Sequence, residues 1–494
     1  MGKKNTPDSS GKLLQMWTAI TAIIIGGLLI GSWIVASQSA NKRPPTDRTA
    51  ALTQTVPQEI AKDVYIGYKD VVYKLSGRDG SVIWQHPLKQ AYQPDRLIGS
   101  YMQVEVVDDV VYAAVEYGIS ALRGSDGKEI WHYRPTLTPA ELAQDLGRIV
   151  EIFIDKSLMY VNYTRADVAA LDLRNGSQKW SHLTFPNGGS FSVSNDTLYV
   201  SESSTKGVPR LHAIDGATGT ERWHFEREMW GNTSLSGAYV VDGVVYSSGN
   251  PLYALNARTG QKLWEQRLPD RSIYFDQLRL LNGVLYGSTS APLALVSGQE
   301  IPPDIYRVYA FDAKTGKQLW HSSPGYSFLD GLVDGGKSVL IQANDVLKER
   351  TLQALDAKNG TLRWQISLVT RPCEPAGFCF APQVYADGNQ LYILDSAQPY
   401  KLQVFDVHTG KQVAQHPVSI PTKEGIGPSL LSNGVLYVRS WVHEGGAYIS
   451  GSSNTFWHYV IYAIRLTNGA TSWKYNIGSL LEYQEPISDL LLAP

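Results

Sequence analysis

Residues 310–320 read AFDAKTGKQLW, and this phrase decides the fold: a turn that ends in glycine is followed four residues later by tryptophan. The phrase occurs nine times, and neighbouring copies lie 41 to 59 residues apart. That interval is typical of the blades of a β-propeller and is too long for a leucine-rich or helical-hairpin array. The pairs are Gly80 and Trp84, Gly127 and Trp131, Gly176 and Trp180, Gly219 and Trp223, Gly260 and Trp264, Gly316 and Trp320, Gly360 and Trp364, Gly410 and Ala414 (the one substitution), and Gly469 and Trp473.

Each repeat predicts four short antiparallel strands, which we name A to D in chain order. Residues 238–266 show the pattern, because four β-rich runs are separated by Gly-containing turns, among them Asp242-Gly243. Glycine supplies the positive φ that the tight C–D turn needs. In five copies an aspartate stands four residues before the glycine, and we interpret it as a turn cap, not as a catalytic acid: Asp172, Asp215, Asp312, Asp356 and Asp406.

The motif tryptophans are predicted to fill the seams between blades. Each one falls on strand D, and a single sheet cannot bury its own two faces, so the blades must stack around an axis. Ala414 then predicts one poorly filled seam. The first repeat lacks an obvious strand A, and residues 484–494, QEPISDLLLAP, are predicted to supply it and to close the ring.

Three copies, AIDGATGTERW (213–223), AFDAKTGKQLW and ALDAKNGTLRW (354–364), resemble the tryptophan-docking repeat of the pyrroloquinoline-quinone-like β-propellers. This superfamily includes quinoprotein alcohol dehydrogenases and the propeller lipoprotein of the outer-membrane barrel-assembly machinery. The resemblance covers about residues 60–494 and implies an all-β propeller, usually of eight blades. The nine motif copies favour nine blades here, with eight as the alternative. Because the fold carries both enzymes and scaffolds, its function must be sought in a site.

The enzyme alternative is a quinone-dependent dehydrogenase of alcohols or sugars, and the resemblance implies what it would need. Its requirements are a calcium ion held by Glu, Asn and Asp oxygens, an aspartate base, a tryptophan under the quinone and often two adjacent cysteines. This chain has no adjacent cysteines and no C-x-x-C-H haem motif, and no residue matches the calcium ligands. We therefore predict no catalytic or metal residues and no cofactor, and we favour a noncatalytic binding or assembly module.

The N-terminus predicts a membrane anchor. Residues 17–36 form an apolar run without a charge, long enough as a helix to span the hydrocarbon core. A cleaved signal peptide is the alternative. We divide the chain into a tail (1–16), the transmembrane helix (17–36), a flexible stalk (37–59) and the propeller (60–494). The single-pass protein is expected to hold its propeller outside the cytoplasm, where Cys373 and Cys379 would form a disulfide.

Four long insertions are predicted at one edge of the ring: residues 135–148, 288–306, 369–382 and 441–458. All four are B–C or D–A connections, and long loops on a rigid platform are the usual place for a binding site. The last one is aromatic, so Trp441, His443, Tyr448 and Trp457 are the candidate face for a protein partner or small ligand. The net charge of −2 predicts no nucleic-acid partner.

Histidines follow several motif tryptophans by one or two residues. They fall on the outer strands of different blades and are therefore not expected to meet at one metal ion. These residues are His86, His132, His182, His224 and His321.

Overall fold

The computed structural model describes residues 61–88, 102–143, 147–164, 167–184, 189–202, 208–228, 238–270, 273–290, 307–323, 326–333, 336–344, 350–368, 382–395, 398–444, 456–481, 488 and 490–493. Internal contacts divide the chain into two units, Met1–Val56 and Pro57–Pro494, and all of these residues belong to the second. Among them, no helix is long and apolar enough to cross a membrane. The predicted transmembrane helix and both cysteines lie outside the described residues.

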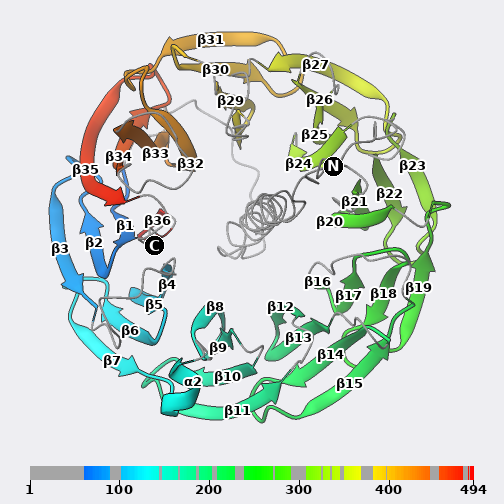
Figure 1. Ribbon diagram of the computed structural model, residues 1–494. Helices are drawn as coiled ribbons and strands as arrows, with labels where there is room; N and C mark the ends of the chain where they lie inside the picture. The colour runs from blue at the N-terminus through cyan, green and yellow to red at the C-terminus, as the bar shows by residue number, and fades with distance from the viewer. Residues whose placement is uncertain are drawn as a thin grey trace, which may run out of the picture. The chain divides into compact units, whose positions relative to one another are not determined.

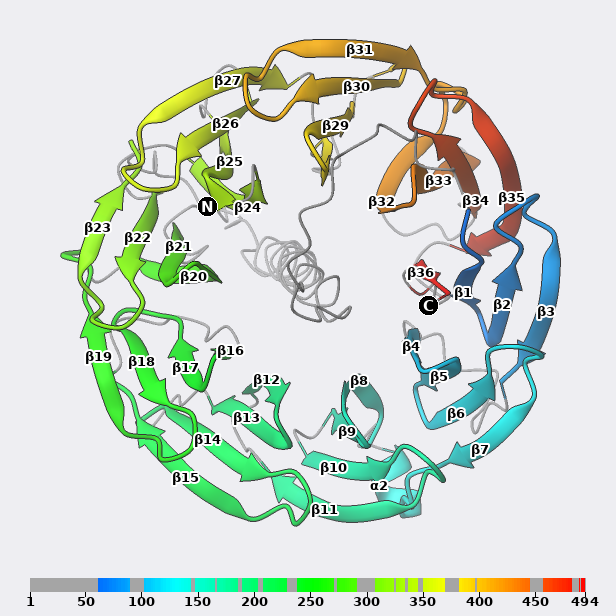
Figure 2. The same cartoon turned by 180° about the vertical axis from the view of Figure 1, so that it is seen from behind.

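The described strands form nine four-stranded antiparallel sheets, which follow one another around a common axis (Figures 1 and 2). The propeller therefore has nine blades, and the eight-blade alternative is wrong. In every sheet strand A is innermost and strand D is outermost.

Blade 1 holds β36 (Leu491–Leu492), β1 (Val64–Tyr68), β2 (Val71–Leu75) and β3 (Val82–Pro87). Blade 2 holds β4 (Met102–Val107), β5 (Val110–Val115), β6 (Gly118–Arg123) and β7 (Glu129–Tyr133), and the helix α2 (Pro139–Ala143) follows it. Blade 3 holds β8 (Ile149–Asp155), β9 (Leu158–Tyr163), β10 (Asp167–Asp172) and β11 (Gln178–Thr184). Blade 4 holds β12 (Gly189–Ser194), β13 (Thr197–Glu202), β14 (Arg210–Asp215) and β15 (Glu221–Glu226). Blade 5 holds β16 (Ala238–Val241), β17 (Val244–Ser247), β18 (Leu252–Asn256) and β19 (Lys262–Gln266).

Blade 6 holds β20 (Tyr274–Leu281), β21 (Val284–Ser290), β22 (Val308–Asp312) and β23 (Gln318–His321). Blade 7 holds β24 (Tyr326–Val333), β25 (Ser338–Asn344), β26 (Arg350–Asp356) and β27 (Leu362–Leu368). Blade 8 holds β28 (Gln383–Asp387), β29 (Gln390–Leu394), β30 (Lys401–Asp406) and β31 (Gln412–Pro417). Blade 9 holds β32 (Gly425–Ser432), β33 (Val435–Glu444), β34 (Phe456–Arg465) and β35 (Thr471–Leu481).

The C–D turns are built as the sequence predicts. In blade 4, Gly219 has φ +73°, and its N–H donates to the carbonyl oxygen of Asp215 at 2.8 Å. The Asp215 carboxylate accepts the backbone N–H of Thr218 at 2.9 Å, so the aspartate caps the turn. Hydrogen bonding from Arg222 and then from Thr218 lowers the pKa of Asp215. The motif aspartates are thus explained by turn structure.

The motif tryptophans bind each blade to the next. A Cβ added to Gly127 would lie 2.7 Å from the indole of Trp84, so only glycine allows the ring to sit on this turn. Eight indoles also donate Nε1–H to a backbone carbonyl oxygen of the following blade at 2.7–3.0 Å. The donor and acceptor residues are Trp84 to Gly124, Trp131 to Leu173, Trp180 to Gly216, Trp223 to Ala257, Trp264 to Ala313, Trp320 to Ala357, Trp364 to Val407 and Trp473 to Gly77.

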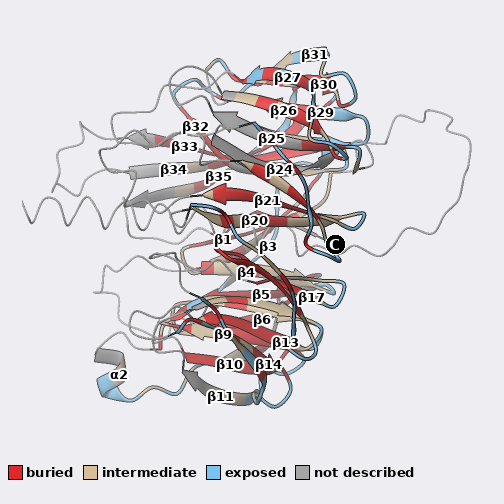
Figure 3. Ribbon diagram, turned by 90° about the vertical axis from the view of Figure 1, so that its right-hand side faces the viewer, coloured by how far each residue is buried: buried red, intermediate tan, exposed pale blue. Residues whose placement is uncertain are grey.

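The ring closes between blades 9 and 1. The C-terminal strand β36 pairs with β1 in the register Val64↔Leu492 and Tyr65↔Leu491, which confirms the predicted closure. Across the same seam, Trp473 lies against Gly80 and donates to the carbonyl oxygen of Gly77. Buried residues run through the middle of the described strands, while many residues of the connecting turns are exposed (Figure 3).

Seam 8/9, between blades 8 and 9, differs because Ala414 replaces the tryptophan. A Cβ added to Gly469 would lie 2.6 Å from Cβ of His416 and 2.7 Å from the carbonyl oxygen of Pro417. Strand β31 itself therefore occupies the place of the ring. Buried side chains of both blades, among them Leu402 and Leu436, pack across this seam. The seam is filled, in contrast to the expectation from the sequence.

Candidate functional site

The four predicted insertions all begin and end at one edge of the ring, which we call the insertion edge. In an antiparallel four-stranded blade the B–C and D–A connections share one edge, and the sheet order confirms this arrangement. The structure describes these four insertions to different extents. Most of residues 135–148 are described, including α2 (Figure 3), whereas 291–306, 369–381 and 445–455 lie outside the described residues.

The aromatic insertion is shorter than the sequence predicts, because β33 continues to Glu444 and β34 begins at Phe456. Trp441 is therefore a strand residue and pairs with Tyr459. A Cβ added to Gly425 or to Gly427 would lie 2.7 Å from the Trp441 indole, so this ring packs against strand β32 of its own blade. Trp441 contributes to the blade and is not a loop residue.

The other members of the candidate face are only partly placed. His443 and Trp457 are register partners on the extended hairpin of β33 and β34, so these two positions lie opposite each other on neighbouring strands. Tyr448 lies outside the described residues. The hairpin carries three of the four predicted positions at the insertion edge.

A cavity of about 160 Å³ lies beside the first insertion, between blades 2 and 3. Its wall combines apolar side chains, such as Leu137 and Val168, with a polar group around Tyr133. The Tyr133 hydroxyl lies 2.9 Å from the Tyr163 hydroxyl and donates to Gln178 Oε1 at 3.0 Å. Burial raises the pKa of Tyr133. The cavity could hold one side chain or small molecule that has an apolar part and a group able to hydrogen-bond with a hydroxyl.

Blade 4 carries a histidine–carboxylate cluster that the sequence analysis missed. His212 Nδ1 lies 2.6 Å from Glu221 Oε2, and His224 Nδ1 lies 2.7 Å from Glu221 Oε1. His212 Nε2 also approaches Glu202 Oε2 at 3.3 Å. Against the effect of burial, hydrogen bonds from both imidazoles lower the pKa of Glu221. The signal was present in the sequence, since His212 and His224 occupy paired positions on strands C and D.

Seam 8/9 contains a buried carboxylate. Glu424 is 6 % exposed, and its carboxylate accepts Ser440 Oγ at 2.6 Å and Tyr462 Oη at 3.0 Å. Its backbone carbonyl oxygen accepts Tyr400 Oη at 2.6 Å. Burial and the charge of Glu424 raise the pKa of Tyr462. Within the described part of the chain, the Glu424 carboxylate accepts hydrogen bonds from hydroxyl groups and has no cationic partner.

Two acids lie on innermost strands. Burial, with a smaller contribution from the charge of Glu105, raises the pKa of Glu151 to about 7. Gln103 links the same two strands, since its side chain donates to the carbonyl oxygen of Ile152 and accepts the Ile152 N–H. Burial also raises the pKa of Asp276 on β20.

The described residues contain no candidate metal centre that could carry the calcium ion of a quinone site. Among them, no group of three or more His, Cys, Asp or Glu side chains is arranged to hold a metal ion, and the side chains of the His212–Glu221–His224 cluster hydrogen-bond one another instead. The histidines that follow the motif tryptophans lie on different blades, as predicted, and the side chain of His182 is not described.

The chain is similar in sequence to several known proteins. A family model described as outer membrane protein assembly factor BamB (PQQ_2) matches residues 33–191, 182–273 and 303–491. The tetrathionate hydrolase of Acidithiobacillus ferrooxidans is 25% identical over 374 residues, which cover 69% of this chain and 71% of that protein. The serine/threonine-protein kinase AfsK of Streptomyces griseus is 27% identical over 276 residues, 49% of this chain but only 33% of the kinase.

Solved structures include similar propellers. BamB from Moraxella catarrhalis superposes with a TM-score of 0.46 and 15% identity, over 69% of this chain and 96% of that one. A quinohemoprotein alcohol dehydrogenase from Comamonas testosteroni gives a TM-score of 0.41 and 14% identity, over 70% and 72% of the two chains. Because the family model spans most of the sequence, the chain belongs to the β-propeller family described as outer membrane protein assembly factor BamB.

Proposed function

We propose that this propeller is a noncatalytic binding module that takes part in the assembly of outer-membrane proteins. The observation that carries the proposal is the family match over residues 33–191, 182–273 and 303–491. We further propose that residues 17–36 anchor the chain in a membrane and that the propeller lies outside the cytoplasm. The apolar length of this segment supports the anchor.

The geometry favours the insertion edge as the place where a protein partner binds. The seams and the closing strand complete the ring from the motif residues and β36, so the insertions are additions to a finished platform. The cavity between blades 2 and 3 offers this partner a recess of about 160 Å³ for one anchoring side chain.

A pair of photocrosslinkers at opposite edges tests the binding edge. Thr136 is exposed and lines the cavity, while Arg258 is exposed in a C–D turn at the opposite edge. A crosslinking amino acid at position 136 should trap components of the outer-membrane assembly machinery in cells, and one at position 258 should not. Crosslinks from position 258 alone would place the partner on the other edge. Crosslinks to no assembly component from either position would contradict the proposal.

The anchor is tested separately. A reporter that is active only in the cytoplasm, fused after residue 60, should be silent, and the full chain should remain with membranes after alkaline washing. An active reporter would show that the propeller lies in the cytoplasm.

A second candidate is catalysis, because the similarity to a tetrathionate hydrolase extends over 69% of the chain. The purified full chain should be assayed with tetrathionate, and with alcohols after addition of the quinone and calcium. Turnover of either substrate would contradict the noncatalytic proposal, whatever the crosslinking shows.

A further inference from the structure

Seam 4/5, between blades 4 and 5, contains a buried arginine. Arg227 directly follows β15 and is only 3 % exposed. Trp223 and Phe225 belong to the hydrophobic cluster of this seam. Because side chains alternate along a strand, Arg227 points into the same seam. Its Nη2 donates to the carbonyl oxygen of Ser248 in blade 5, which places the guanidinium between the two blades.

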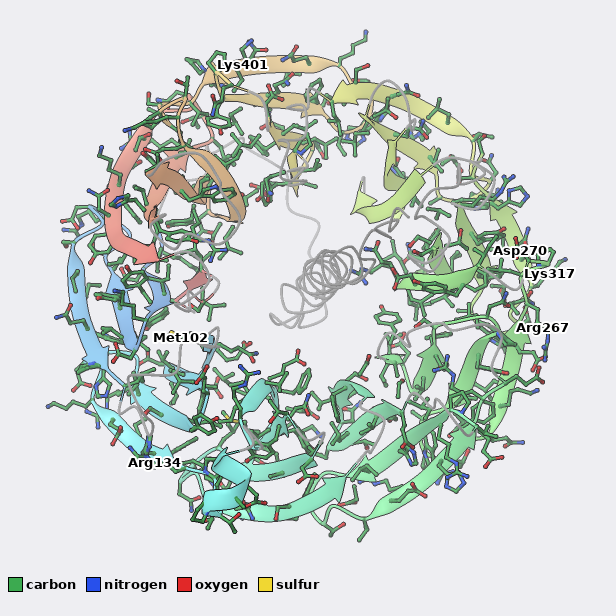
Figure 4. The ribbon with its side chains drawn as sticks, viewed as in Figure 1. Met102, Arg134, Arg267, Asp270, Lys317 and Lys401 are labelled. Atoms are coloured by element: carbon green, nitrogen blue, oxygen red, sulfur yellow. The ribbon has the colours of Figure 1, made fainter. Side chains whose placement is uncertain are left out.

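No carboxylate balances this charge among the described residues. Arg227 Nε and Nη1 have no hydrogen-bond partner there. The neighbouring acids are engaged elsewhere: Glu226 pairs with Arg210 at 2.9 Å, and Glu228 pairs with Arg267 at 2.7 Å. Arg267 lies on the outer rim of the ring (Figure 4). A buried charge without a counter-charge strongly destabilises a fold, so the seam needs an additional partner.

The guanidinium stays protonated despite its burial. Burial lowers the pKa of Arg227 to about 10, which is still well above neutral pH. The backbone is shaped around the group, because Gly249 has φ +130° and a Cβ added there would lie 2.7 Å from Arg227 Nη2. The backbone of blade 5 therefore accommodates the Arg227 guanidinium specifically.

Two serines of the same seam also have buried hydroxyl groups that find no hydrogen-bond partner in the described part of the chain. Ser201 on β13 and Ser247 on β17 are each 1 % exposed, and neither Oγ has a hydrogen-bond partner among the described residues. Tyr199 and Val245, two residues before them, belong to the seam 4/5 cluster, so the hydroxyls face the same seam. Ser247 directly precedes the residue whose carbonyl oxygen binds Arg227.

We propose that Arg227, Ser201 and Ser247 bind a buried monovalent anion of the halide class between blades 4 and 5. All three side chains can donate hydrogen bonds, and a halide only accepts them. One negative charge balances one guanidinium, whereas a water molecule would satisfy the donors and leave the charge uncompensated. The anion would cross-link two blades at a place that contains no ion pair among the described residues.

Halide-dependent stability tests the site in the full chain. Raising chloride to about 100 times its dissociation constant, with gluconate keeping the ionic strength constant, should raise Tm by about 3 °C. Arg227→Met should abolish this dependence. Arg210→Met is the matched control, since Arg210 is exposed and paired with Glu226, and it should respond like the unchanged protein. If Arg227→Met does not fold, Ser247→Ala should require about tenfold more chloride for half of the effect.

Bromide locates the ion directly. Crystals of the full chain grown in bromide should show an anomalous peak within hydrogen-bonding distance of Arg227 Nε or Nη1. A Tm that does not depend on chloride, or the absence of bromide from this seam, would overturn the proposal.

Discussion

At the scale of single residues, the motif tryptophans carry the seams. We expect Trp364→Ala to lower the free energy of unfolding by about 3–5 kcal/mol, because it deletes a buried ring and its hydrogen bond to Val407. Gly410→Ala should destabilise the same seam, since its φ is +65° and a Cβ would lie 2.7 Å from the Trp364 indole. Val413→Ala, on an exposed position of the outer strand, is the control. Equal denaturation midpoints for all three variants would contradict this role.

Glu151 predicts a pH dependence of stability. Its folded pKa of about 7 is above the ordinary value of 4.5, so the protonated form is favoured in the folded state. This contribution is complete below about pH 4.5 and is lost as the pH rises through 7. Glu151→Gln should therefore unfold like the unchanged protein near pH 4 and be more stable by about 1–3 kcal/mol at pH 8.

Glu105→Gln separates the two causes of the raised Glu151 pKa. Burial is the larger cause and the charge of Glu105 the smaller one, so this variant should shift the pH midpoint only slightly toward acid. A shift as large as the whole effect would mean that the charge of Glu105 dominates. An unchanged pH profile in Glu151→Gln would show that another group produces it.

At the scale of elements, the sequence predicted what local chemistry determines. The tight A–B and C–D turns follow from residues such as Asp242-Gly243, which have φ of +50° and +74°. The sequence did not predict that β33 extends past Trp441. The Trp441 ring packs on Gly425 and Gly427 of strand β32, and this contact between strands cannot be read from the local sequence. Arg227 and Ser247 belong to different blades, so their shared seam appears only in the folded ring. Alternation from Trp223 could have placed Arg227 on the buried face.

The extended hairpin of blade 9 gives a prediction that differs from a loop interpretation. Trp441→Ala should lower the free energy of unfolding by about 2–4 kcal/mol, because the indole packs on two glycines of β32. Deleting residues 451–454, which lie between the described parts of the hairpin, is the matched change and should leave the unfolding midpoint nearly unchanged. If Trp441→Ala also leaves it unchanged, Trp441 is free to serve a partner instead of the blade.

At the scale of the whole molecule, stability depends on a ring in which every blade touches two others. Eight seams share one design, and seam 8/9 combines a strand–glycine contact with the hydroxyl-bound Glu424. Each seam is local in structure but joins neighbouring repeats, so the propeller behaves as a closed array of similar units. Only the seam between blades 9 and 1 joins the two ends of the sequence, through Trp473 and through β36.

Removing β36 tests how much the closing strand contributes. A chain that ends at residue 487 loses the partners of Val64 and Tyr65, both fully buried, and leaves β1 as an open edge. Open edges promote pairing with other chains. We therefore expect an earlier unfolding transition and concentration-dependent association, detected by light scattering, whereas removal of residue 494 alone should change neither. If the shortened chain stays monomeric and equally stable, the contact of Trp473 with Gly80 is sufficient to close the ring. Strand β36 would then contribute little to stability.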